Sequence, residues 1–104
     1  MQLVKAKEFV ADRAWGALPI ERFAGTTTVE LHWTDQPYRW HRNDGPEVFV
    51  VLDGEVEMLI RKDGVQTSVH MQAGDVLHIA EGEAHVAHPV GVARVLVIET
   101  AGSQ

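Results

Sequence analysis

The stretch that decides the fold is His41-Arg42-Asn43-Asp44-Gly45-Pro46-Glu47-Val48-Phe49-Val50-Val51-Leu52-Asp53-Gly54. Its first part, up to Pro46, has the composition of a turn. The apolar run that follows is rich in β-branched and aromatic residues, which favour strands. The Asp-Gly pair at its end is a strong signal for a tight hairpin turn, because glycine accepts a positive φ. This stretch therefore predicts a strand between two turns, with His41 and Glu47 flanking the first turn.

The alternation of strand and turn continues along the chain. Further turns are predicted at Lys62-Asp63-Gly64, Ala73-Gly74-Asp75 and Glu81-Gly82-Glu83. The strands predicted from Glu47 onward cover residues 47–52, 55–61, 65–71, 76–79, 85–89 and 93–99. Apolar Val29, Leu31 and Trp33 alternate with polar residues between Thr28 and Thr34, which predicts a half-buried strand there as well. Many short strands with glycine turns predict an all-β sandwich or barrel.

The N-terminal residues 1–19 carry a weaker pattern. Lys7 to Trp15 shows a loose helical spacing without a convincing cap, which predicts either a short helix or an arm docked on the barrel. With 104 residues and no internal repeat, linker or low-complexity segment, the chain is expected to form a single domain, residues 1–104.

Composition narrows the functions that the chain can have. A formal charge of -6 opposes binding to a nucleic-acid backbone. No run approaches the roughly 18 apolar residues of a membrane helix, and the N-terminus lacks the apolar block of a secretory signal, so we expect a soluble, cytoplasmic protein. Because the chain has no cysteine, any metal must be held by nitrogen and oxygen.

Two runs, Val48–Leu52 and Val92–Ile98, are largely apolar on both faces. One face can fill the barrel, but the other needs a second cover, either a packed outer sheet or a partner subunit. We therefore expect a homodimer.

Three residues are candidates for a metal site. His41 and Glu47 flank one turn, and His85 opens a strand after a glycine loop. If both loops lie at the same end of the barrel, two imidazoles and one carboxylate converge, which is the donor set of a facial triad with open positions. The alternative is that three polar residues at loop ends are exposed and unrelated.

At these residues the chain resembles the cupins. The segment from His41 to Gly54 is similar to the first cupin motif, and Gly74 to His85 is similar to the second, so that the resemblance spans residues 26–99. It implies a double-stranded β-helix, a jelly-roll-like barrel, with His41, Glu47 and His85 as ligands of a divalent metal ion such as Fe, Mn, Ni or Zn.

The chain departs from that pattern at three positions. The second histidine of the first motif is Asn43, the proline of the second motif is Ala80, and Asp35 stands where a glycine is expected before His41. Asn43 could act as a weak fourth ligand, orient a metal-bound water or initiate the local turn. Arg39 shares strand parity with His41, so it could hold an anionic substrate group, unless it is an exposed arginine at a strand edge.

The remaining histidines and the aromatic residues are interpreted more conservatively. His32, His70, His78 and His88 are expected to be surface or hydrogen-bonded histidines, with His88 pointing away from His85. Trp15, Trp33 and Phe49 either line the cavity or belong to the core.

The function expected from the resemblance is a small metal-binding cupin that binds a small oxygenated molecule, with no assigned activity. Three alternatives stay open. The first is a metal-dependent dioxygenase, isomerase or lyase, and the second is a non-catalytic module that binds or senses a small molecule. The third is a barrel that has lost its metal, which the replacement by Asn43 favours. Fold alone does not decide between them.

Overall fold

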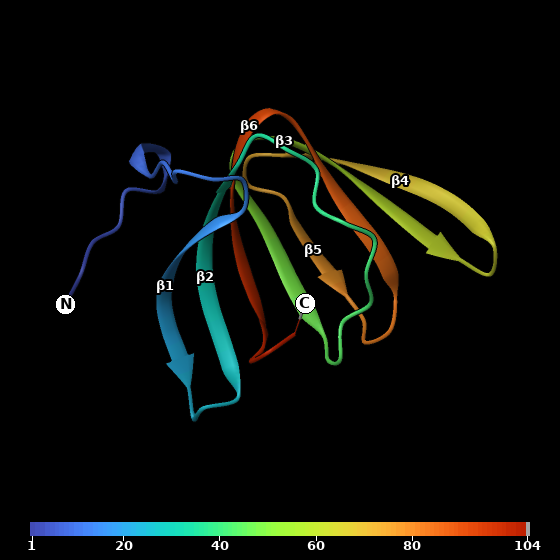
Figure 1. Ribbon diagram of the computed structural model, residues 1–104, viewed down its shortest axis with the longest axis horizontal. Coiled ribbons are helices and arrows are strands. Elements are labelled where there is room, and N and C mark those ends of the chain that lie inside the picture. Colours follow the sequence, from blue (N-terminus) through green and yellow to red (C-terminus); the bar gives the residue numbers. More distant parts are fainter. Residues whose placement is uncertain (104) are drawn as a thin grey trace.

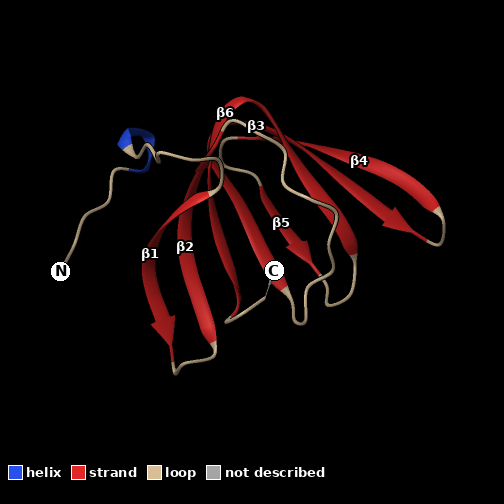
Figure 2. Ribbon diagram, viewed as in Figure 1, coloured by secondary structure: helices blue, strands red, loops and turns tan. Residues whose placement is uncertain are grey.

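The computed structural model describes residues 1–103 and forms one six-stranded antiparallel sheet that curls around a core (Figures 1 and 2). The strands are β1 (Gly16–Phe23), β2 (Thr27–Thr34), β3 (Glu47–Lys62), β4 (Val65–Gln72), β5 (Val76–Ile79) and β6 (Ala84–Thr100). Their order is β1-β2-β6-β3-β4, and β5 pairs with β3. The all-β prediction is confirmed.

Two long strands organise this sheet. β3 and β6 pair along almost their whole length, and both strands extend from one end of the molecule to the other. The first half of β3 also pairs with β5, and its second half with β4. The two strands predicted at 47–52 and 55–61 are therefore one strand, and so are those predicted at 85–89 and 93–99.

The Asp53-Gly54 hairpin turn was a wrong prediction. The strand bends there instead of reversing, with register shifts on both sides of Asp53. Gly54 has a φ of 81°, and a Cβ at this position would lie 2.3 Å from the carbonyl oxygen of Val92. Arg94 of β6 donates to the Asp53 carboxylate at 2.8 Å. Close approach of the two strands at this corner therefore requires glycine.

The other glycine turns are found where the sequence predicts them. Residues 63–64 connect β3 to β4, residues 73–75 connect β4 to β5, and residues 80–83 connect β5 to β6. Inward side chains of the strands fill the core. The core residues are Phe49, Val51, Val56, Met58, Met71, Ile79, Ala87, Ala93, Val95 and Val97.

The N-terminal segment forms a short 3₁₀ helix, η1 (Ala6–Glu8), and otherwise runs as an arm beside the sheet (Figure 1). Phe9 accepts a hydrogen bond from Arg94 at 2.8 Å through its carbonyl oxygen, which ties the arm to the corner of β6. β1 begins at Gly16, within the stretch 1–19 that was predicted as a helix or arm. Residues 16–19 of that stretch therefore belong to a strand, which continues to Phe23. In residues 1–103 we find no helix with the length and apolarity needed to span a membrane.

Candidate metal centre

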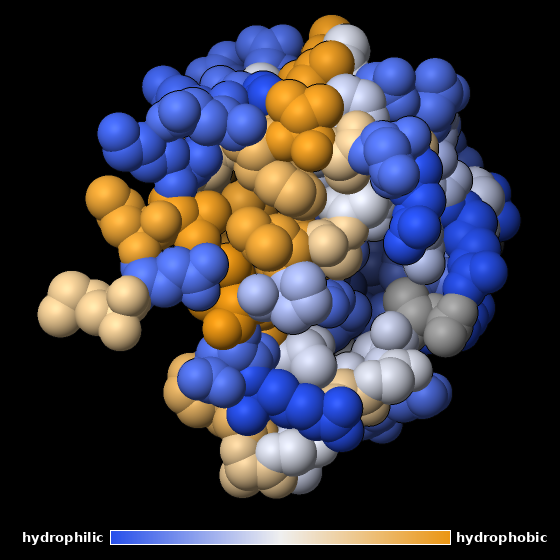
Figure 3. Space-filling model, turned by 60° about the vertical axis from the view of Figure 1, so that its left-hand side comes forward, coloured by the Kyte–Doolittle hydropathy of each residue, from blue (hydrophilic) through white to orange (hydrophobic). Residues whose placement is uncertain are grey.

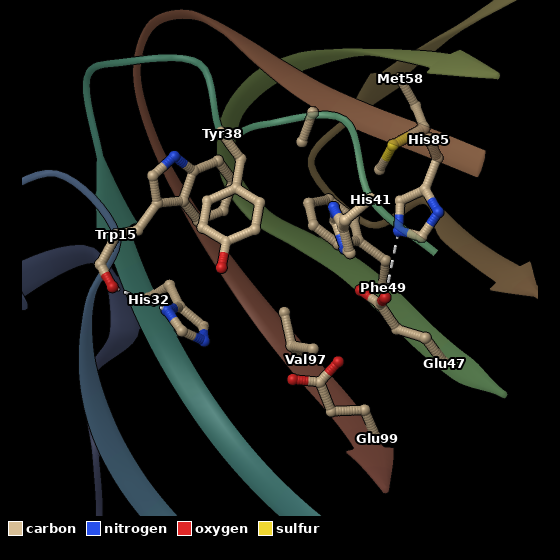
Figure 4. A pocket seen from close by; sticks show the side chains of 11 residues that line it. Trp15, His32, Tyr38, His41, Glu47, Phe49, Met58, His85, Val97 and Glu99 are labelled. Carbon is tan, nitrogen blue, oxygen red and sulfur yellow. Dashed lines mark hydrogen bonds and ion pairs between the residues drawn. The ribbon is translucent and has the colours of Figure 1, made fainter. Parts of the chain in front are cut away.

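His41, Glu47 and His85 lie together at one end of the curled sheet. One ligand atom from each lies within 4.8 Å of the others. The His41 and His85 rings have centroids 4.3 Å apart, and His85 Nε2 lies 3.4 Å from a Glu47 carboxylate oxygen (Figure 4). The structure thus brings together the three residues that the sequence nominated.

Each of these residues is positioned by a different element. Glu47 is the first residue of β3, and His85 is the second residue of β6. His41 lies in the loop between β2 and β3 and reaches the site through an isolated bridge, in which the backbone N–H and carbonyl of His41 and His85 exchange two hydrogen bonds of 3.1 Å. His41 and Glu47 flank the turn but do not pair across it as in a hairpin, because His41 is anchored to β6.

Contacts between two loops hold the bridge in place. Arg42 donates to the carbonyl oxygen of Gly82 at 2.9 Å, and the N–H of Gly82 donates to the carbonyl oxygen of Asn43 at 3.1 Å. The loop before β3 and the turn before β6 are therefore fastened to each other beside the histidine pair.

The hydrogen bonds of the two histidines define which ring nitrogen faces the site. His41 Nδ1 lies 2.9 Å from the carbonyl oxygen of Arg39, and His85 Nδ1 lies 2.8 Å from that of Glu83. A carbonyl only accepts, so in the neutral form of each ring Nδ1 carries the proton and Nε2 keeps a lone pair. This is the tautomer that second-shell carbonyls impose on metal-binding histidines.

A divalent ion fits this donor set. His85 is 2% exposed, and its Nε2 has no hydrogen-bond partner among the described residues. Glu47 is 5% exposed. Buried polar atoms normally have partners, so an orphaned imidazole nitrogen beside a buried carboxylate is the geometry expected where a cation binds.

Asn43 contacts this triad through Glu47. It is 3% exposed, and its amide Nδ2 donates a hydrogen bond to a Glu47 carboxylate oxygen. Asn43 does not line the cavity, and it donates to the same Glu47 oxygen, Oε1, that faces His85 Nε2, so this contact orients the carboxylate next to the histidine pair.

Burial and charge shift the pKa values of three groups at the site. Burial lowers the pKa of His41. Burial also acts to lower the pKa of His85, but contacts with Glu47 and with the Glu83 carbonyl outweigh it, so that this pKa is raised. Burial, and then the charges of Glu47 and Glu30, raise the pKa of Glu99 to about 7.

A cavity of about 120 Å³ opens beside the triad (Figure 4). Besides the triad, its lining residues are Trp15, His32, Tyr38, Phe49, Met58, Ala87, Val97 and Glu99. Trp15 and Phe49 therefore line the cavity, which was one of the two alternatives, whereas Trp33 does not.

The segment before His41 is not a regular strand, so strand parity does not apply to it. Tyr38, which by the same parity would face the side opposite to Arg39, lines the cavity. Arg39 is exposed, which was one of its two alternatives, and its guanidinium lies 5.5 Å from the centroid of the Tyr38 ring. A substrate contact by Arg39 stays an untested prediction.

The other histidines lie outside the triad. His32 lines the cavity, and its Nδ1 donates to the carbonyl oxygen of Trp15 at 3.1 Å. His70 is exposed and hydrogen-bonded to Glu57, His78 is exposed on β5, and half-buried His88 pairs with Glu57 of β3. None of these four joins the group of potential metal ligands found among the described residues.

Sequence reasoning missed Glu99 and Tyr38 as lining residues. Glu99 could have been found, because it continues the inward parity of Val95 and Val97 on β6. Tyr38 lies in a loop, where no periodicity indicates direction.

Comparisons with known proteins identify the fold. No family model and no curated protein matches this chain in sequence. Among solved structures, a cupin-2 domain containing protein from Shewanella frigidimarina matches with a TM-score of 0.75 and 22% identity, over 86% of this chain and 84% of that chain. The chain has the cupin fold.

Two further structures agree with this result. A cupin superfamily protein from Desulfitobacterium hafniense matches with a TM-score of 0.76 and 16% identity, over 96% of this chain and 90% of that chain. Oxalate decarboxylase from Bacillus subtilis matches with a TM-score of 0.64 and 20% identity, over 71% of this chain but only 21% of that enzyme. At these identities the cupin likeness establishes the fold, while the activity must be argued from the site.

Proposed function

We propose that this chain is a small metal-binding cupin in which His41, Glu47 and His85 hold a divalent transition metal and the open coordination positions face the cavity. The observation that carries the proposal is the convergence of three donor atoms within 4.8 Å. Two imidazoles and one carboxylate suit Fe, Mn, Ni or Zn, because these ions accept nitrogen and oxygen donors.

Three protein ligands leave positions free for a small oxygenated molecule. Such an ion supplies Lewis acidity, which polarises a bound oxygen. The chain itself contributes fixed ligand tautomers, an amide that orients Glu47, and a cavity walled by Phe49, Met58 and Val97 that limits access of water.

Metal content tests the ligand assignment. Wild-type protein purified without an affinity tag should carry about one divalent ion per chain by elemental analysis. His41→Ala and His85→Ala should each lose most of it, since each removes one of three donors. His78→Ala is the matched control, because His78 is exposed on β5. Undiminished metal in the double variant H41A/H85A, with the fold intact, would reject the site.

Turnover distinguishes an enzyme from a binding module. Oxygen consumption and product formation should be screened with the metal-loaded protein against small acids, diketones and sugars. Catalysis that disappears when the metal is removed supports a dioxygenase, isomerase or lyase. Saturable binding without product supports a binding or sensing module.

A further inference from the structure

The charges that line the cavity have one sign. Glu47 and Glu99 line it, whereas no lysine or arginine of the described chain does. The two acids are direct cross-strand partners on β3 and β6, so their side chains lie on the same inner face of the sheet. If Glu47 binds the metal ion, Glu99 is the acidic group left for the rest of a ligand.

Glu99 lies between the triad and an aromatic wall. Figure 4 shows the Trp15 and Tyr38 rings on one side of the cavity, the triad on the other, and the Glu99 carboxylate pointing into the space between them. The Trp15 ring is held by a 2.9 Å hydrogen bond from its indole N–H to the carbonyl oxygen of Gln36, and its centroid is 5.3 Å from that of Tyr38. A carboxylate that points into a cavity with a fixed indole in its wall is a setting that attracts a cation.

Arg39 is the cationic group near the cavity that could make the cavity favour an anion over a cation. Its charge reaches His41, but the side chain is exposed and stands against Tyr38 without lining the cavity. Solvent screens exposed charges far more than it screens groups inside a cavity. We therefore expect Glu99, and not Arg39, to decide which ligand charge is accepted.

We propose that the cavity selects a small cationic amine that carries a hydroxyl oxygen, with the hydroxyl directed to the triad and the amine held between Glu99 and Trp15. Binding of the ligand's hydroxyl rests on the proposed function, because it requires the metal ion at the triad. Binding of the amine requires only residues of the chain itself. A small dianion such as oxalate would meet Glu99 with like charge, which disfavours its binding.

Three probes of similar size test the charge preference. Choline is a cation, 3,3-dimethyl-1-butanol is its neutral carbon isostere, and hydroxypivalate places a carboxylate at the corresponding end. Binding is followed at pH 8, above the pKa of Glu99, by NMR at the Trp15 indole N–H, which is assigned from its loss in Trp15→Phe. Choline should bind at least about fivefold more tightly than the alcohol, and hydroxypivalate should bind most weakly.

Variants show whether Glu99 causes this ranking. Glu99→Gln should bring choline to within about twofold of the alcohol, whereas Glu99→Asp, which keeps the charge, should preserve most of the preference. Arg39→Gln is the control and should leave the ranking unchanged. In metal-free protein, equal binding of choline and the alcohol, tightest binding of hydroxypivalate, or a ranking that responds to R39Q and not to E99Q would overturn the proposal.

Each titration is made with metal-free and with zinc-loaded protein, so that the two proposals fail separately. If zinc does not bind, the metal function falls, and the metal-free titration still tests the amine end. If zinc binds but the cation is not preferred in either state, the charge selection falls and the metal site stands.

Discussion

Asn43 shows how one residue departs from the cupin motif and still serves the site. It stands where the motif has a second histidine, yet its amide donates to Glu47 and does not line the cavity. A hydrogen bond to a metal-binding carboxylate fixes its orientation and raises the affinity for the ion. The sequence offered three roles for Asn43, and the contact with Glu47 favours an orienting role within a three-ligand site.

Replacing Asn43 tests that role. Asn43→Ala should weaken zinc binding by about 10- to 100-fold without changing the stoichiometry, because Glu47 loses its partner but all three donors stay. Competition with a chromogenic chelator measures the affinity, and elemental analysis measures the stoichiometry at saturation. If Asn43 were instead a direct ligand, N43A would also change the coordination number measured by X-ray absorption on the zinc-loaded protein.

Glu99 makes the stability of the metal-free protein depend on pH. Its folded-state pKa is raised to about 7 from an unfolded value near 4.5, first by burial and then by Glu47 and Glu30. The folded state therefore holds this proton more tightly than the unfolded state. Ionisation of Glu99 therefore destabilises the folded state. The stability contributed by the protonated form is present below the unfolded pKa and is lost as the pH rises through about 7.

Removing the carboxylate should reduce this pH dependence. In metal-free protein, E99Q should be more stable than wild type at pH 8 by about 1 kcal/mol, a value discounted for partial exposure, and the difference should shrink at pH 5. Urea unfolding at both pH values measures it. Equal stabilities at pH 8 would mean that the carboxylate is not destabilised by its surroundings.

At the scale of elements, local signals predicted the strands better than they predicted the connections between them. Asp-Gly is a hairpin signal at both 53–54 and 63–64, yet only the second pair reverses the chain. The difference arises from β6, which pairs with β3 on both sides of Asp53 and supplies Arg94 to its carboxylate. Such a long-range partner cannot be inferred from two adjacent residues.

Gly54 and Gly64 give a matched test of this difference. Both have a positive φ, 81° and 77°, but a Cβ at Gly54 would meet the Val92 carbonyl, whereas nothing lies within 4 Å of one at Gly64. Gly64→Ala should cost about 1 kcal/mol from backbone strain alone. Gly54→Ala should cost at least about 2 kcal/mol more, because the two strands must separate. Chemical denaturation measures both, and equal losses would refute a close-packed corner.

The contrast between local signals and long-range contacts also explains how much of the site could be predicted. His41, Glu47 and His85 were nominated because they matched a motif, not because their contacts were foreseen. The bridge between His41 and His85, which aligns them, depends on a loop with no periodicity. For the same reason the sequence could not decide between the two alternatives for Arg39 or place Tyr38, since parity holds only within a strand.

At the scale of the whole molecule, the outer face of the sheet is apolar where β2, β3 and β6 lie side by side. Val29, Val48, Val50, Leu96 and Ile98 are on this face and are only half-buried. All six strands belong to one sheet, so within residues 1–103 no second sheet covers it.

Apolar atoms are also exposed near the N-terminal arm. Figure 3 shows them on the face that is turned forward, where a shallow hollow is lined by Leu3, Val4, Phe9 and Leu18 among others. From the sequence we expected a partner subunit to cover the outer sheet face. We propose that this face joins two copies of the chain.

A charge placed on the outer face tests this dimer. Val48 pairs with Ile98 on one side and His78 on the other, near the middle of the face, so Val48→Asp would bury a carboxylate in the interface. The dimer dissociation constant should rise at least about 100-fold, because an unpaired buried charge costs several kcal/mol. Val65→Asp is the matched control, since Val65 is 61% exposed at the β3–β4 turn and lies far along the sheet from this face. Light scattering should give a dimer for wild type and V65D and a monomer for V48D. A wild-type monomer at about 100 μM, well above the dissociation constants of stable dimers, would show that the half-buried valines face water and that no second copy covers them.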